Sequence, residues 1–234
     1  MDTPLRLPSL VCAICVAVML GAQASGSAQP SPPPAQTLPS TIPIFPLPDV
    51  MLFPSMARPL HIFEPRYRAL VADALNGDRL IGMVMLLPGY EQDYEGRPPI
   101  YAIGCAGRIA NVEALPDGSY NILLHGLVKF RVTSEDHSRP YRLAHVEALH
   151  ESTADADRAA LAEQRAELTT LLMAIVPSSN RPPQALPDEN LVNGIAQYAD
   201  IDPLDRQDLL ELDGPLARAQ LLIDLLDTQV SAPR

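Results

Sequence analysis

The stretch "IPIFPLPDVMLFPSMARPLHIFEPRYRALVADAL", residues 42–75, contains short apolar segments interrupted by proline and ends in a helical pattern. Pro54 and Pro59 divide its middle into extended pieces, because proline lacks the N–H that a sheet ladder uses. Pro65 suits the first turn of a helix, and Asn76-Gly77 is a typical helix end. Between these signals, one apolar stripe at helical spacing is formed by Tyr67, Leu70, Val71, Ala74 and Leu75. The stretch therefore predicts extended segments followed by a single helix.

The centre of this stretch is dense in ionisable side chains and resembles a catalytic cluster at first sight. The position of each residue relative to the predicted strand and helix instead indicates structural roles. Leu60, Ile62 and Phe63 end an extended segment, and Glu64 precedes the helix, where negative charge is favoured. Tyr67 faces the core, whereas Arg66 lies off the apolar stripe and is expected to face solvent. For His61 we expect a structural hydrogen bond.

The residues up to 149 continue with mostly β signals. Residues 79–87 form an apolar run that predicts a buried strand. Residues 100–115 and 119–135 are two long strands around Pro116-Asp117-Gly118, a strong hairpin turn. The second of these strands is expected to bend at its glycine, Gly126. Residues 141–149 alternate in polarity and close the set, and the even spacing of the strands favours a small barrel or sandwich.

After residue 150 the pattern becomes helical. The expected helices cover residues 154–176, 188–200, 203–212 and 215–230. The sequence thus predicts an α+β chain, with a β-rich subdomain over residues 42–149 and a helical subdomain over residues 150–231.

The N-terminus has the features of a targeting segment. Residues 10–22 form an apolar run that is short for a membrane span but suits a signal peptide. Ala22 and Ala24 are small residues at the positions that signal peptidase reads, so we expect a signal peptide over residues 1–24, with cleavage after Ala28 as the alternative. Residues 25–41 are a Pro/Ser-rich linker. The chain is therefore expected to be exported, to the periplasm or the medium; it would be cytoplasmic if the start of the chain is misassigned.

Charge and composition narrow the classes of function. The net charge is −11, which disfavours binding to nucleic acid or stable association with a membrane after signal cleavage. Lys129 is the single lysine, and no Walker A pattern surrounds it. Val128, Phe130 and Val132 alternate with Lys129, so we expect the lysine to point into solvent.

The sequence contains no motif for metal binding or nucleophilic catalysis. The five histidines show no ligand spacing, and no GxSxG pattern is present. Cys105 lies in an apolar strand and is expected to be a buried, inert thiol. We therefore expect no metal, no cofactor and no catalytic residue.

Three segments in order resemble one known family. Residues 42–75, "GCAGRI…LPDGSYNILLHGLVKFRV" (104–132) and "IDPLDRQDLLELDGPLARAQLLIDLL" (201–226) are similar to the N-terminal substrate-binding domain of Lon proteases, most of all in bacterial proteins that carry this domain alone. The similarity covers about residues 42–228. It implies a PUA-like β pseudo-barrel around one helix, followed by a helical bundle. The motif residues to which the resemblance gives a structural role are His61, Phe63, Glu64, Pro65, Arg66 and Tyr67.

The resemblance implies recognition of polypeptide segments rather than proteolysis, because these 234 residues show neither the Walker A nor the Ser-Lys elements of a Lon protease. Apolar side chains in loops are the candidate contacts, namely Phe53, Met56, Tyr90 and Tyr94. Phe53 and Met56 can alternatively pack on the barrel, so Tyr90 and Tyr94 are the better candidates. Two alternatives stay open: a structural or regulatory domain for one folded partner, and a hydrolase using the region of His61 and Glu64. The sequence does not indicate an oligomeric state.

Overall fold

The computed structural model describes residues 37–90, 93–94, 96–151, 154–175 and 186–231. The predicted signal peptide and most of the predicted linker lie outside these residues. All of the described residues belong to one unit by their mutual contacts. Within them, no helix is both long enough and apolar enough to cross a membrane.

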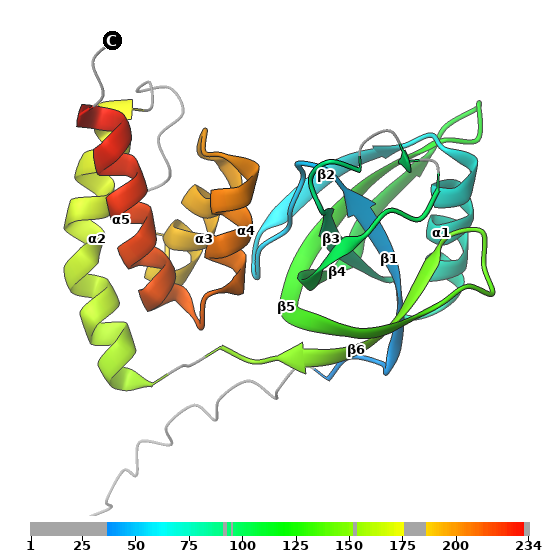
Figure 1. The fold of residues 1–234 in the computed structure, drawn as a ribbon, viewed down its shortest axis with the longest axis horizontal. Coiled ribbons are helices and arrows are strands. Elements are labelled where there is room, and N and C mark those ends of the chain that lie inside the picture. The colour runs from blue at the N-terminus through cyan, green and yellow to red at the C-terminus, as the bar shows by residue number, and fades with distance from the viewer. Residues whose placement is uncertain (1–36, 91–92, 95, 152–153, 176–185, 232–234) are drawn as a thin grey trace, which may run out of the picture. The chain divides into compact units, whose positions relative to one another are not determined.

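Among the described residues, six strands form one mixed sheet, and the predicted α+β class is confirmed (Figure 1). The strand order is β2-β5-β4-β3-β1-β6, and β5 also pairs with β6, so the sheet returns on itself in a ring-like arrangement. The strands are β1 (Thr41–Leu47), β2 (Ala57–Ile62), β3 (Leu80–Leu86), β4 (Ile100–Ala114), β5 (Tyr120–Asp136) and β6 (Arg142–Leu149).

The long strand β5 allows this return because its two halves have different partners. Residues 120–125 pair with β2, whereas most of residues 129–136 pair with β6. Gly126 lies between the halves, as the sequence predicted. A Cβ at this glycine would lie 2.1 Å from the carbonyl oxygen of Phe53, so only glycine fits there.

The interior of the ring is filled with side chains. Phe130 is fully buried there, and its ring covers two glycines of neighbouring strands. A Cβ on Gly82 would lie 2.7 Å from the Phe130 ring, and one on Gly104 would lie 3.0 Å from it. The small residues therefore provide the room that the phenylalanine occupies.

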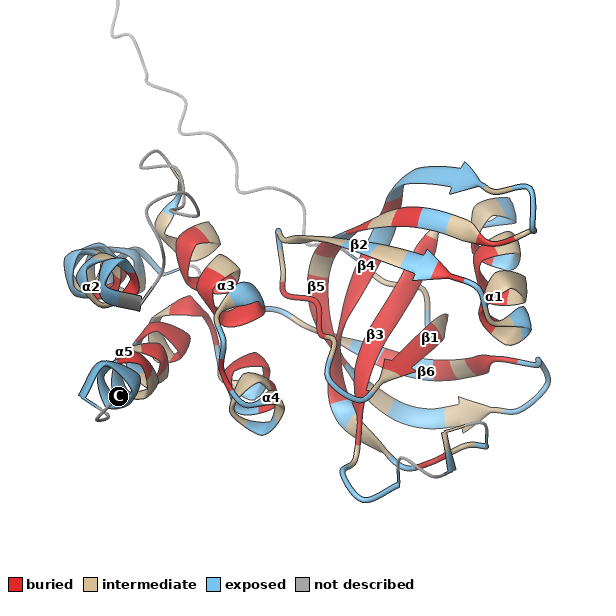
Figure 2. Ribbon diagram, turned by 90° about the horizontal axis from the view of Figure 1, so that it is seen from above, coloured by how far each residue is buried: buried red, intermediate tan, exposed pale blue. Residues whose placement is uncertain are grey.

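Helix α1 (Pro65–Asn76) has the bounds that the sequence predicted. Its buried residues are Tyr67, Leu70, Val71 and Ala74, four of the five members of the predicted stripe. Figure 2 shows the helix beside one end of the sheet, with its buried face toward the strands. The helix ends where the N–H of Gly77 donates to the carbonyl of Ala74.

In the part of the chain that the structure describes after β6, four helices follow the sheet, and their positions agree with the sequence pattern. Asp202 caps one of them by accepting a hydrogen bond from the N–H of Leu204 at 2.8 Å. The apolar faces of these helices join the main core cluster of the strands and α1. The helices are α2 (Asp155–Ile175), α3 (Asp188–Tyr198), α4 (Pro203–Glu211) and α5 (Pro215–Ser231).

A fully buried arginine connects the helices to the strands. Arg218 of α5 donates from Nε to the carbonyl of Leu209 at 2.9 Å and from Nη1 to Oδ1 of Asn193. Its Nη2 donates to Oε1 of Glu151, just after β6, at 2.5 Å. The guanidinium also lies 5.3 Å from the ring centroid of Phe53. Every nitrogen of this buried cation has an acceptor, which its desolvation requires.

Lys129 joins the same network, and its predicted exposure is wrong. The residue is 3% exposed, its ammonium lies 3.2 Å from Glu151, and it donates to the carbonyl of Leu212. Desolvation lowers the pKa of Lys129, while the charge of Glu151 acts in the opposite direction. The alternation correctly separated Lys129 from Phe130. The error arose because the outer face of β5 is covered at this point by the segment between α4 and α5.

Replacing Arg218 by Met is expected to lower the free energy of unfolding by about 3–5 kcal/mol. The reason is that the acceptors on Asn193 and Leu209 would be left without a hydrogen-bond donor inside the core. Lys129→Met should cost less, about 1–2 kcal/mol, because only the carbonyl of Leu212 loses its donor, Glu151 keeps Arg218 as its partner, and a desolvated ammonium is removed. Urea unfolding followed by far-UV circular dichroism measures both, as the chain has no tryptophan to report by fluorescence.

The matched control is Arg158→Met in α2. Arg158 pairs with Asp155, and their side chains are 52% and 99% exposed. Its loss should change the stability by no more than about 0.5 kcal/mol. Equal costs for Arg218→Met and Arg158→Met would contradict the role of the buried network.

Candidate functional site

Two pockets adjoin the N-terminal end of α1 and share the side chains of Tyr67, Leu86 and Tyr94. The larger, of about 460 Å³, is mostly apolar and is called here the apolar pocket. Its lining comprises Phe45, Leu47, Pro48, Asp49, Leu60, His61, Ile62, Phe63, Glu64, Tyr67, Leu86 and Tyr94. The smaller, of about 240 Å³, contains three arginines and is called the arginine pocket. Its lining comprises Pro46, Arg66, Tyr67, Leu86, Tyr94, Gly96, Arg97, Pro98, Pro140, Tyr141 and Arg142.

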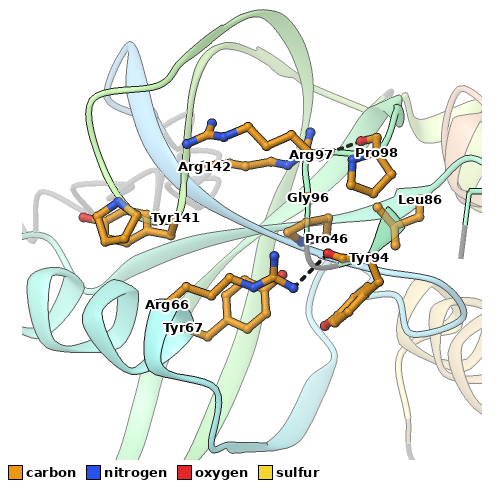
Figure 3. Close-up of a pocket in the computed structure, with 11 residues that line it drawn as sticks. Pro46, Arg66, Tyr67, Leu86, Tyr94, Gly96, Arg97, Pro98, Tyr141 and Arg142 are labelled. Carbon is orange, nitrogen blue, oxygen red and sulfur yellow. Dashed lines mark hydrogen bonds between the residues drawn. The ribbon is translucent and has the colours of Figure 1, made fainter. Parts of the chain in front are cut away.

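A hydrogen-bonded cluster of Glu64, Arg66 and Tyr94 contributes to both pockets. Arg66 Nε donates to Glu64 Oε2 at 3.0 Å, and Arg66 Nη2 donates to the carbonyl of Tyr94 at 3.0 Å. The hydroxyl of Tyr94 donates to Glu64 Oε1 at 2.9 Å. Figure 3 shows Arg66 beside Tyr67, with its bond to Tyr94 dashed. These hydrogen bonds attach the loop between β3 and β4 to the N-terminal end of α1.

The expectation that Arg66 faces solvent is wrong. Its side chain is 17% exposed, and its guanidinium lies 4.6 Å from the ring centroid of Tyr67 and 4.8 Å from that of Tyr94. The sequence placed Arg66 off the apolar stripe of α1, and Tyr94 from a distant loop packs against that side of the helix. Glu64 precedes the helix as predicted, but its side chain makes no capping hydrogen bond and pairs with Arg66 instead.

Tyr94 of this cluster and the neighbouring Tyr67 are both neutral phenols at ordinary pH. Burial raises the pKa of Tyr94, and the neighbouring Tyr67 and Glu64 raise it further. Burial likewise raises the pKa of Tyr67, against the opposing charge of Arg66. Neither phenol is therefore poised to act as a base near neutral pH.

His61 and Phe63 lie at the open side of the apolar pocket. His61 is exposed, its Nδ1 is 2.8 Å from Asn121 Oδ1, and its ring stacks on Phe63 with centroids 5.9 Å apart. This is the type of structural hydrogen bond that the sequence analysis expected for His61. Phe63 is 63% exposed, the largest value among the large apolar residues exposed in the described part of the chain.

The four predicted contact residues separate into two groups. Tyr94 lines both pockets, and Tyr90 is 46% exposed in the same connection between β3 and β4. Phe53 is fully buried, and its N–H donates to Gln197 of α3 at 2.9 Å, so it presents no surface to a ligand. Met56 is half-buried and packs against the core.

Sequence reasoning missed the arginine pocket. Arg97 belongs to a loop without a periodic pattern, and nothing local marks it. Arg142 carried a signal: in residues 141–149 it shares a face with Ala144 and Val146, and both of these are buried. A charged residue on an inward face of a strand is a candidate for a pocket or an ion pair.

Two potentially reactive side chains outside the pockets, Cys105 and Ser119, have structural surroundings. Cys105 is buried, as predicted, and burial raises the pKa of its thiol to about 12. The hydroxyl of Ser119 is bonded to Asp117 within the hairpin turn. Within the described ranges, no group of three or more His, Cys, Asp or Glu side chains is placed to hold a metal ion.

Comparison with known proteins gives a consistent family. Residues 41–228 match the family described as "ATP-dependent protease La (LON) substrate-binding domain". Lon protease 2 of Sorangium cellulosum is 29% identical over 217 residues, which are 86% of this chain and 27% of that protein. Lon protease of Trichlorobacter lovleyi is 30% identical over 81% of this chain and 24% of its own. The chain thus spans about a quarter of the length of these relatives.

Solved structures show the same fold. The N-terminal domain of a Mycobacterium avium complex Lon protease aligns with a TM-score of 0.58 at 21% identity, covering 80% of this chain and 98% of that domain. A Lon N-terminal domain protein from Xanthomonas campestris aligns with a TM-score of 0.58 at 24% identity, covering 79% and 97%. With a family match over residues 41–228, this chain belongs to the family of Lon substrate-binding domains.

Proposed function

We propose that this chain binds exposed polypeptide segments and catalyses no reaction itself. The observation that carries the proposal is the apolar pocket beside Phe63. An aromatic side chain that is 63% exposed next to a preformed apolar hollow of about 460 Å³ offers burial to one or two side chains of an extended ligand. The description of the matched family as a substrate-binding domain supports the same class of ligand.

In this proposal, the polypeptide ligand is bound mainly by side chains of the protein and less by its main chain. β2, which leads into Phe63, pairs with β5 alone in the strand order and contains Pro59. Because proline has no N–H, a ligand strand gains fewer main-chain hydrogen bonds along this edge. Phe63 and Tyr94 are therefore the proposed principal contacts, with Tyr90 as a further contact in the same loop.

The non-catalytic part of the proposal is supported by the state of the reactive groups. The thiol of Cys105 is inaccessible, and the hydroxyl of Ser119 is held in a turn. His61 has a side-chain amide as its partner and is not paired with a nucleophile. A serine or cysteine nucleophile needs a base within hydrogen-bonding reach, and these residues do not provide that arrangement.

Phe63→Ser is expected to weaken binding of an unfolded polypeptide about tenfold, because a central aromatic contact contributes roughly 1–2 kcal/mol. Fluorescence polarisation with a labelled, permanently unfolded model protein measures the affinity. Light scattering of an aggregating protein measures the same activity independently.

Leu204→Ser in α4 is the matched control, since Leu204 is 45% exposed and lies outside both pockets. It should bind like the wild type. If the wild type ignores unfolded protein at high micromolar concentration and instead retains one folded partner at fixed stoichiometry, the proposal is wrong and a dedicated interaction domain replaces it.

We also propose that residues 1–24 are a cleaved signal peptide and that the protein acts outside the cytoplasm. The support is the apolar run at residues 10–22 followed by small residues. N-terminal sequencing of the protein from its native cells should give Ser25 as the first residue, or Gln29 after the alternative cleavage. An intact Met1 in a soluble fraction would contradict export.

A further inference from the structure

The arginine pocket contains more positive charge than the described residues neutralise. Arg66 is paired with Glu64, and Arg142 donates to both carboxylate oxygens of Glu135 at 3.0 and 3.1 Å. The third guanidinium, Arg97, donates from Nη2 to the carbonyl of Arg139 at 3.0 Å. It forms no ion pair with a described carboxylate. The pocket therefore has an excess of positive charge, although the whole chain has a net charge of −11.

Arg97 also has an unused donor. Its Nη1 is shielded from solvent and has no hydrogen-bond acceptor among the described residues. A buried donor without a partner is destabilising, and the cost is larger for a charged group. An anion in the pocket supplies both the missing acceptor and the missing negative charge.

The walls of the pocket limit the size and chemistry of such an anion. Figure 3 shows Arg66 and Tyr67 on one side, and Arg97 and Arg142 opposite them. The phenol of Tyr141 is already committed to Asp73 at 2.6 Å. The volume of about 240 Å³ is below that of sites for drug-sized ligands, so a single small anionic group fits.

The neighbouring apolar pocket indicates what carries this anionic group. The two pockets share Tyr67, Leu86 and Tyr94, so a ligand that fills one lies directly beside the other. We propose that the arginine pocket binds the C-terminal carboxylate of a polypeptide whose last apolar side chains occupy the apolar pocket. This inference rests on the proposed function and specifies which end of the ligand is recognised.

The experiment compares three labelled peptides of one apolar sequence by fluorescence polarisation with the full chain. One has a free C-terminal carboxylate, the second a C-terminal amide, and the third an amide with Glu as its last residue. The wild type should bind the free acid about tenfold more tightly than the amide, as expected for charge-assisted hydrogen bonds. The preference should shrink as salt is added.

Arg97→Gln should weaken binding of the free acid about tenfold and so abolish the difference between the free acid and the amide. Arg97→Lys should restore part of it, because the charge returns without the planar fork of donors. The matched control is Arg131→Gln, which removes one exposed arginine outside both pockets and should keep the full preference. Circular dichroism confirms that each variant is folded.

The outcomes separate this inference from the proposed function. Equal binding of acid and amide by the wild type overturns the inference and leaves the proposed function intact. Binding of neither peptide overturns both. If the amide with terminal Glu binds as tightly as the free acid, the pocket recognises any carboxylate and the assignment to the C-terminus is wrong. Competition by inorganic phosphate without a preference for the free acid also overturns it.

Discussion

The burial of one guanidinium determines how the two halves of this protein are joined. Burial of Arg218 is tolerated because each of its three side-chain nitrogens donates a hydrogen bond. The three acceptors come from separate parts of the chain. Leu209 belongs to α4, Asn193 to α3, and Glu151 to the segment that follows the sheet. These hydrogen bonds of Arg218 can therefore form only when α3, α4 and α5 are packed together against the end of β6. Phe53, beneath the guanidinium, extends the same contact to the segment before β2.

Local signals in the sequence were sufficient for most of the fold. Proline at the start of a helix, an apolar stripe and a terminal glycine gave α1 with its correct bounds. The turn at Pro116-Asp117-Gly118 and the glycine at 126 gave the paired, bent strands. These features depend on neighbours within a few residues, so a single sequence contains their causes. The wider architecture came from the resemblance of three ordered segments to one family.

The failures concern long-range neighbours. The alternation of apolar and polar residues indicates which face of β5 carries Lys129. The carbonyl of Leu212, which covers this face, is 83 residues away in the sequence. Arg66 was placed correctly on the helix, yet Tyr94 arrives from 28 residues further along and buries it. The helix that covers Phe53 is α3, whose Gln197 is 144 residues further along the chain, so no local pattern shows that Phe53 is buried. A pattern fixes the direction of a side chain relative to its own element, and only the assembled molecule shows what lies in that direction.

The connection between β3 and β4 starts and ends at nearly the same place, since the N–H of Leu87 donates to the carbonyl of Pro99 at 2.9 Å. This bond closes the base of the loop that supplies Tyr94 and Arg97 to the two pockets. Sequence changes beyond the base need not alter the pairing of the two strands. Substitutions in this loop can therefore change the lining of both pockets without touching the packed interior around Phe130. The closed base thus separates the residues that line the pockets from those that hold the two strands together.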